Sequence, residues 1–86
     1  NNEHTENIIN YGMMLPNIKI SVLFREEKDK IGITFRSKKN IDVSRIAKKF
    51  NGGGHKNASG CKIYDTLENA KKIVIQELFK YIKNEK

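Results

Sequence analysis

Residues 51–60, NGGGHKNASG, place a histidine and a lysine directly after three consecutive glycines. Glycine loses more conformational freedom on folding than any other residue, so a run of three needs a physical reason. Without side chains, Gly52, Gly53 and Gly54 can adopt positive φ and turn their N–H groups toward one point, a geometry that binds phosphate. His55 can donate a hydrogen bond to a phosphate oxygen or a ribose hydroxyl. The segment therefore predicts an anion site, and the alternative is a flexible turn with a solvent-facing histidine.

Basic residues are concentrated around this segment. The chain has 86 residues and a formal net charge of +7. Nine basic residues and one acidic residue lie between positions 30 and 62, so that segment alone carries +8. They are Lys30, Arg36, Lys38, Lys39, Arg45, Lys48, Lys49, Lys56 and Lys62, against Asp42. An excess of this size favours an anionic partner such as nucleic acid, unless the lysines only solvate the surface.

Other kinds of site are weakly supported by the residue types. The two histidines and the cysteine lie far apart and lack the spacing of a zinc site, and no Asp/His cluster offers a two-metal site. Cys61 is predicted to be a small core residue rather than a nucleophile. As the single cysteine it cannot form an internal disulfide, which indicates a reduced, cytoplasmic setting. No apolar run approaches the ~20 residues of a membrane helix, so no membrane partner is expected.

Hydrophobic periodicity predicts the elements that position these residues. Residues 3–12 are predicted to form a short leading helix that ends at a glycine. Alternating apolar residues predict strands over 18–24 and 31–36, paired as an antiparallel hairpin. Since Phe35 belongs to the apolar face of the second strand, Arg36 points to the opposite face, at the end of that strand.

The second half of the chain continues in the same way. Asp42 is predicted to cap a helix over residues 43–50, with a left-handed stop directly after it. After the glycine loop comes a short strand over 61–63, and Asp65 or Thr66 then caps a long helix. The predicted order is α-β-β-α-loop-β-α. This order describes an α/β (α+β) two-layer domain with a small mixed sheet.

Residues 35–60, FRSKKNIDVSRIAKKFNGGGHKNASG, resemble the DHH-associated C-terminal domain of DHH-family phosphoesterases. The similarity is greatest to the oligoribonuclease/pAp-phosphatase (nanoRNase-like) subgroup, also labelled exopolyphosphatase-related. Arg-Ser after a strand, Ile-Asp-Val-Ser at a helix start, Gly-Gly-Gly-His and a closing small residue with glycine occur in the same order. The flanks agree as well, so the resemblance covers most of the chain, and residues 1–86 are expected to be one such domain excised from a longer protein.

The resemblance implies a division of labour. In this family a DHH domain holds Mn²⁺ ions in an Asp/His cluster and performs the hydrolysis, while the present kind of domain binds the nucleotide or short single-stranded nucleic acid. No residue of this chain corresponds to the metal ligands, so we expect it to bind and not to cut, beside a DHH domain of the same polypeptide. The resemblance places substrate binding on Arg36, Gly52, Gly53, Gly54 and His55 and, matching less firmly, on Asn57, and Lys56 beside them is expected to contribute its positive charge.

Two functions stay open at this point. One is the substrate-binding half of a phosphoesterase that hydrolyses oligoribonucleotides or pAp. The other is a non-catalytic RNA- or DNA-binding module similar to the domain appended to alanyl-tRNA synthetases, although Gly-Gly-Gly-His after Ile-Asp-Val-Ser favours the first. Tyr64 and Phe35 are aromatic residues that could stack a base, but both fit the core better.

Overall fold

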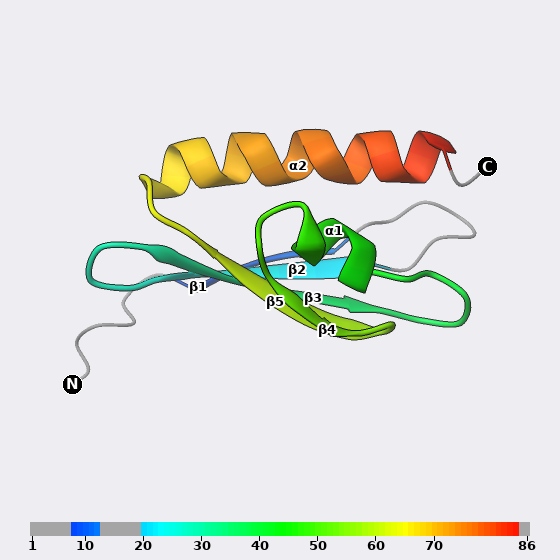
Figure 1. Ribbon diagram of the computed structural model, residues 1–86. Helices are drawn as coiled ribbons and strands as arrows, with labels where there is room; N and C mark the ends of the chain where they lie inside the picture. Colours follow the sequence, from blue (N-terminus) through cyan, green and yellow to red (C-terminus); the bar gives the residue numbers. More distant parts are fainter. Residues whose placement is uncertain (1–7, 13–19, 85–86) are drawn as a thin grey trace.

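Five strands and two helices form the residues that the computed structural model describes, 8–12 and 20–84 (Figure 1). In chain order they are β1 (Ile8–Gly12), β2 (Ile20–Glu26), β3 (Ile31–Ser37), α1 (Ser44–Lys48), β4 (Gly53–His55), β5 (Ala58–Ile63) and α2 (Leu67–Asn84). The strands form one sheet in the order β1-β2-β3-β5-β4, and both helices lie on the same face of it. The predicted two-layer α/β architecture is confirmed.

Two expectations about the elements are wrong. The predicted leading helix is replaced over Ile8–Gly12 by strand β1, which pairs antiparallel with β2, while residues 3–7 lie outside the described residues. A short isolated helix is marginal in water, whereas the edge of β2 supplies backbone partners to a segment rich in β-branched residues. The sheet is also not mixed, because each of its four strand pairs is antiparallel.

The core lies between the sheet and the helices. Alternate residues of β2 and β3 are at most 2% exposed, and they pack against buried residues of α1 and α2. These are Ile20, Val22, Phe24, Ile31, Ile33 and Phe35 from the strands, and Val43, Ile46, Ala47, Ala70, Val74 and Leu78 beside them. The intervening strand residues, such as Thr34 and Arg36, point to the opposite face, which we call the outer face. Arg36 is exposed there, as predicted.

Helix α1 begins one residue later than predicted. The Asp42 carboxylate accepts hydrogen bonds from the Ser44 N–H (3.0 Å) and the Ser44 hydroxyl (2.6 Å), while Val43 occupies the cap position. The bond from the Ser44 hydroxyl is the main cause that holds the pKa of Asp42 below its usual value. The Asp42 N–H in turn donates to the Tyr81 hydroxyl (3.0 Å), which ties the start of α1 to α2.

The left-handed stop after α1 is confirmed and sets the direction of β4. Asn51 has a φ of 64°, and its N–H donates to the Lys48 carbonyl (3.1 Å). The Gly52 N–H donates to the Ala47 carbonyl (2.9 Å), which completes the hydrogen-bond pattern of a Schellman motif. The chain therefore reverses within two residues and enters the edge of the sheet as β4.

Thr66 caps helix α2 from the position before its first residue, since its hydroxyl accepts a hydrogen bond from the Asn69 N–H (3.1 Å), so the second of the two predicted caps is confirmed. No described helix is long and apolar enough to cross a membrane. Below α2, Cys61 is buried in the core as predicted. Burial raises the pKa of its thiol to about 11, so the sulfur is protonated at neutral pH and is not a nucleophile.

Candidate functional site

The pairing of β3, β5 and β4 brings Arg36 and His55 onto one row of the sheet. Ala58 of β5 pairs with Arg36 on one side and with His55 on the other. Directly paired residues of antiparallel strands share a face, so the side chains of Arg36 and His55 both project from the outer face. Neighbouring strands lie about 4.8 Å apart, which puts the two backbones about 10 Å apart with only the Ala58 methyl between them.

The next row along the strands has almost no side chains. Gly60 of β5 pairs with Thr34 on β3 and with Gly53 on β4. A Cβ atom at Gly53 would meet no heavy atom within 4 Å, so the backbone is open at this point. A ligand held by Arg36 and His55 can therefore approach the sheet closely across two glycines.

The other two glycines of the run have structural roles. A Cβ at Gly52 would lie 2.1 Å from the Gly60 carbonyl oxygen and 2.6 Å from the Cys61 Cβ. Gly54 has a φ of 142°, and a Cβ there would lie 2.6 Å from the Ser59 Cα. The fold therefore needs glycine at both positions.

The predicted nest of converging amides is not formed. The Gly52 N–H already donates to the Ala47 carbonyl (2.9 Å), and the next residues run as strand β4 instead of curling around one point. Of the three glycines only Gly54 has a φ in the left-handed range, because the pairing with β5 keeps this segment extended. Gly53 remains the glycine whose missing side chain opens the outer face.

Asn57 holds the loop that follows Arg36. Its side-chain amide donates to the Ser37 hydroxyl (3.0 Å) and to the carbonyls of Ile41 (3.1 Å) and Lys39 (3.3 Å). Lys39 lies at the turn of this loop with a φ of 57°. The amide nitrogen of this predicted binding residue is thus engaged within the protein, where it fixes the chain beside the site.

Replacing Asn57 with alanine is expected to lower the free energy of unfolding by about 1–3 kcal/mol, because acceptors in the loop lose their donor. Urea unfolding followed by circular dichroism measures the change. Asn40→Ala is the matched control, since Asn40 is exposed in the same loop and is expected to change stability by less than about 0.5 kcal/mol. Equal stability of Asn57→Ala and the unaltered chain would show that the amide does not hold the loop.

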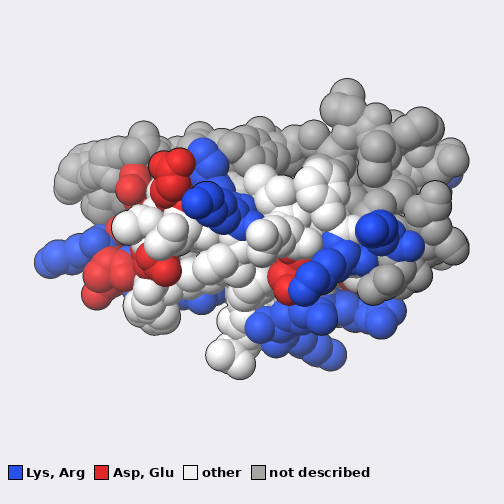
Figure 2. Space-filling view, turned by 90° about the horizontal axis from the view of Figure 1, so that it is seen from above, with Lys and Arg blue, Asp and Glu red and all other residues white. Residues whose placement is uncertain are grey.

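Cationic side chains lie at the same end of the molecule as the row of Arg36 and His55. Figure 2, which looks onto the face that carries the helices, shows Lys and Arg side chains gathered at the end with α1, and most of the visible Asp and Glu at the opposite end. Arg36, His55 and Lys56 are exposed, and none of them forms an ion pair with a residue that the structure describes. These groups are free to meet an anion, which a guanidinium binds through two parallel hydrogen bonds.

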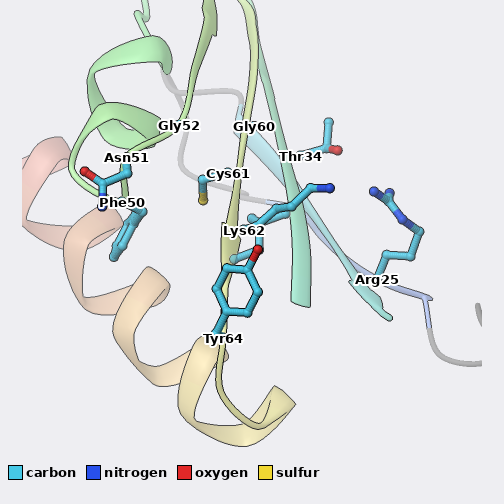
Figure 3. A pocket seen from close by; sticks show the side chains of 10 residues that line it. Arg25, Thr34, Phe50, Asn51, Gly52, Gly60, Cys61, Lys62 and Tyr64 are labelled. Atoms are coloured by element: carbon cyan, nitrogen blue, oxygen red, sulfur yellow. The ribbon is translucent and has the colours of Figure 1, made fainter. Parts of the chain in front are cut away.

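A hollow of about 540 Å³ begins at the next row, that of Thr34 and Gly60, and follows the edge of β5, with Phe50, Asn51 and Cys61 on its helix side (Figure 3). Gly52, Gly60, Thr34, Lys62 and Tyr64 line part of it. Tyr64 is 73% exposed, which corrects the expectation that it belongs to the core, whereas Phe35 is fully buried. The signal was present in the sequence, because the alternation that puts Ala58 on the outer face also puts Gly60, Lys62 and Tyr64 there.

The residues that the structure describes do not fit a Mn²⁺ ion. Among them, no three His, Cys, Asp or Glu side chains come together in a group that could hold a metal. The exposed side chains of Arg36, His55 and Lys56 and the open backbone at Gly53 are groups that can bind an anion.

Comparison with known proteins identifies the family of this chain. Residues 1–84 match the DHHA1 domain. Over 47 residues, 55% of this chain and 15% of the relative, the sequence is 49% identical to the bifunctional oligoribonuclease and PAP phosphatase NrnA of Bacillus subtilis (strain 168). A crystal structure of an exopolyphosphatase-related protein from Bacteroides fragilis is similar with a TM-score of 0.71 and 42% identity.

That structural match covers 79% of this chain and 20% of the Bacteroides chain. The chain thus spans less than a quarter of the length of either relative. The matched domain and both relatives agree with the resemblance seen in residues 35–60. This chain belongs to the DHHA1 domain family, the domains that accompany DHH-family hydrolases.

Proposed function

We propose that this chain binds the phosphates of a nucleotide or short single-stranded nucleic acid on behalf of a DHH-family phosphoesterase. The observation that supports the proposal most is the row formed by Arg36, Ala58 and His55 on the outer face, next to the bare backbone of Gly53 and Gly60. Two exposed groups that can donate hydrogen bonds flank a strip without large side chains, which suits a sugar–phosphate backbone.

Each part of the site has a role in this proposal. The Arg36 guanidinium donates two parallel hydrogen bonds to one phosphate, and His55 donates to a phosphate oxygen or ribose hydroxyl from the other side. Gly53 and Gly60 allow the ligand to approach the sheet. Lysines at the same end, among them Lys56, raise the local concentration of the anion through long-range attraction.

Hydrolysis is assigned to the DHH domain in this proposal, together with Mn²⁺ and the Asp/His cluster that binds it. The role proposed for the described residues of this chain is to hold and orient the phosphate. Both relatives carry names of phosphate-ester or polyphosphate hydrolases, which favours this function over the RNA- or DNA-binding module of alanyl-tRNA synthetases.

The 86-residue chain is expected to bind pAp and a five-nucleotide oligoadenylate with dissociation constants of about 10⁻⁴–10⁻⁶ M, the range of contacts made mainly to phosphate. Raising the salt concentration from about 50 to 200 mM should lower the affinity for the oligonucleotide tenfold or more, because each phosphate that the protein neutralises releases counterions. Isothermal titration calorimetry at the two concentrations measures the effect. An affinity that does not change with salt would contradict a phosphate-binding function.

A further inference from the structure

The outer face of β5 continues beyond the row of Arg36 and His55. Alternate residues of a strand lie on the same face of the sheet. On β5 and directly after it, the residues of the outer face are Ala58, Gly60, Lys62 and Tyr64. Strand β4 pairs with β5 only as far as Gly60, whereas β3 pairs with it up to Ile63. Past Gly60, no strand that the structure describes pairs with β5 on the β4 side, and the hollow of Figure 3 lies along this part.

Lys62 is the free cation of this part of the face. It is exposed and forms no ion pair within the described part of the chain. Arg25, which also lines the hollow, is held by Glu27 through a contact of 3.0 Å between Nε and Oε2, and its guanidinium lies over Gly32. A phosphate that enters the hollow therefore meets Lys62 as its unengaged partner.

Tyr64 presents an aromatic ring at the far end of the hollow. The Lys30 Nζ lies 5.9 Å from the centre of the ring, and Lys30 is itself held by Glu27 (3.7 Å) and Asp29 (3.8 Å). In Figure 3 the ring lies along β5 below Lys62. An exposed aromatic ring offers a surface on which a nucleobase of any sequence can stack.

The charges near Tyr64 favour a base over a phosphate at this end. Acidic side chains gather here, but Glu27 and Asp29 are paired with cations. The Asp65 carboxylate accepts hydrogen bonds from the Thr66 N–H (2.6 Å) and the Asn69 amide (3.0 Å), so it is turned toward the start of α2. A neutral base can therefore contact the ring, whereas a phosphate is better placed one position back, at Lys62.

We propose that Tyr64 and Lys62 form a second subsite for an oligonucleotide, with a base stacked on Tyr64 and a phosphate at Lys62, an inference that rests on the proposed function. From Ala58 to Tyr64 the chain rises about 20 Å, at about 3.3 Å per residue. A stacked single strand advances about 3.4 Å per nucleotide, so a fully stacked strand needs roughly six nucleotides to cover this distance, and a five-nucleotide ligand reaches Tyr64 when its strand lies extended on the protein. A mononucleotide held by Arg36 and His55 does not reach Tyr64.

The test compares pAp with five-nucleotide oligoadenylate by calorimetry. Tyr64→Ala should lower the affinity for the oligonucleotide about 5- to 100-fold, because base stacking on one aromatic side chain has this magnitude. The affinity for pAp should stay within twofold of its value in the unaltered chain. Tyr64→Phe keeps the ring and should bind both ligands like the unaltered chain. Lys62→Ala should reduce the salt dependence of oligonucleotide binding more than Lys72→Ala, which removes an exposed lysine from α2.

Ligand length provides a second test on the unaltered chain. The affinity should rise at least tenfold from a two-nucleotide to a five-nucleotide oligoadenylate, because only the longer ligand reaches Tyr64. The proposed subsite is wrong if affinity does not rise with the length of the oligoadenylate, or if Tyr64→Ala lowers the affinities for pAp and for the oligonucleotide equally. Failure of the proposed function looks different, since Arg36→Ala would then leave the binding of both ligands unchanged.

Discussion

Alanine at Gly52 or Gly54 is expected to lower the free energy of unfolding by about 2–4 kcal/mol. At Gly52 the new Cβ would lie 2.1 Å from a backbone oxygen of Gly60, so β4 and β5 must move apart. At Gly54 the new residue would meet the Ser59 backbone and also keep a φ of 142°, which L-residues rarely adopt. Both substitutions therefore lower the stability of the fold even when no ligand is present.

Gly53 is the matched control within the same run. Its Cβ position is open, so Gly53→Ala should leave stability unchanged or raise it by up to about 1 kcal/mol. Gly53→Val places a branched side chain on the outer face beside Gly60, where it should block the close approach of a ligand and weaken pAp binding. This separation of stability from binding is the expected signature of the glycine run.

Urea unfolding of the alanine variants and calorimetric titration of Gly53→Val with pAp measure the two effects. Equal loss of stability at Gly52, Gly53 and Gly54 would contradict the assignment of structural roles to two of the three. Full affinity of Gly53→Val would show that the ligand does not approach the sheet at this row.

Arg36→Ala is expected to weaken pAp binding about 10- to 150-fold, because a hydrogen bond to a charged group contributes roughly 1.5–3 kcal/mol. The side chain is exposed on the outer face and forms no ion pair among the described residues, so the fold should be retained. Arg36→Lys should restore part of the affinity, since an ammonium keeps the charge but lacks the planar fork of donors.

Lys72→Ala provides the control for charge alone. Lys72 is exposed on α2, and its removal lowers the net charge by the same one unit. Calorimetric titration with pAp, alongside thermal melts of both variants, should show a small effect for Lys72→Ala and a large one for Arg36→Ala. If the two variants lose affinity equally, attraction to the overall charge explains the binding and Arg36 is not part of a defined site.

Local patterns predicted the elements that flank the site well. The alternation in β2 and β3 is a strong signal because one face is buried and the other is not, and it placed Arg36 on the outer face. The asparagine after α1 predicted the left-handed reversal, since Asn adopts positive φ more readily than most residues. These features depend on neighbours in the sequence, so the sequence alone was sufficient.

What the sequence did not predict depends on pairing between distant segments. Strand β1 exists because β2 offers it an edge, and the short β4 exists because β5 does. The separate roles of Gly52, Gly53 and Gly54 follow from which backbone lies opposite each one, which no local pattern contains. Tyr64 is exposed because it follows Lys62 on the outer face at the end of β5. The alternation of the strand indicates this position, but an aromatic residue is more often expected in the core.

Amide chemical-shift mapping by NMR during titration with pAp shows whether the outer face of β3, β5 and β4 binds phosphate. The largest shifts are expected to cluster at Arg36, Gly53, His55, Ala58 and Gly60, while the amides of α2 stay unchanged. Arg36→Ala should abolish the cluster at the same pAp concentration. Shifts centred on α2, or small shifts scattered over surface lysines without a cluster at this row, would contradict the proposed site.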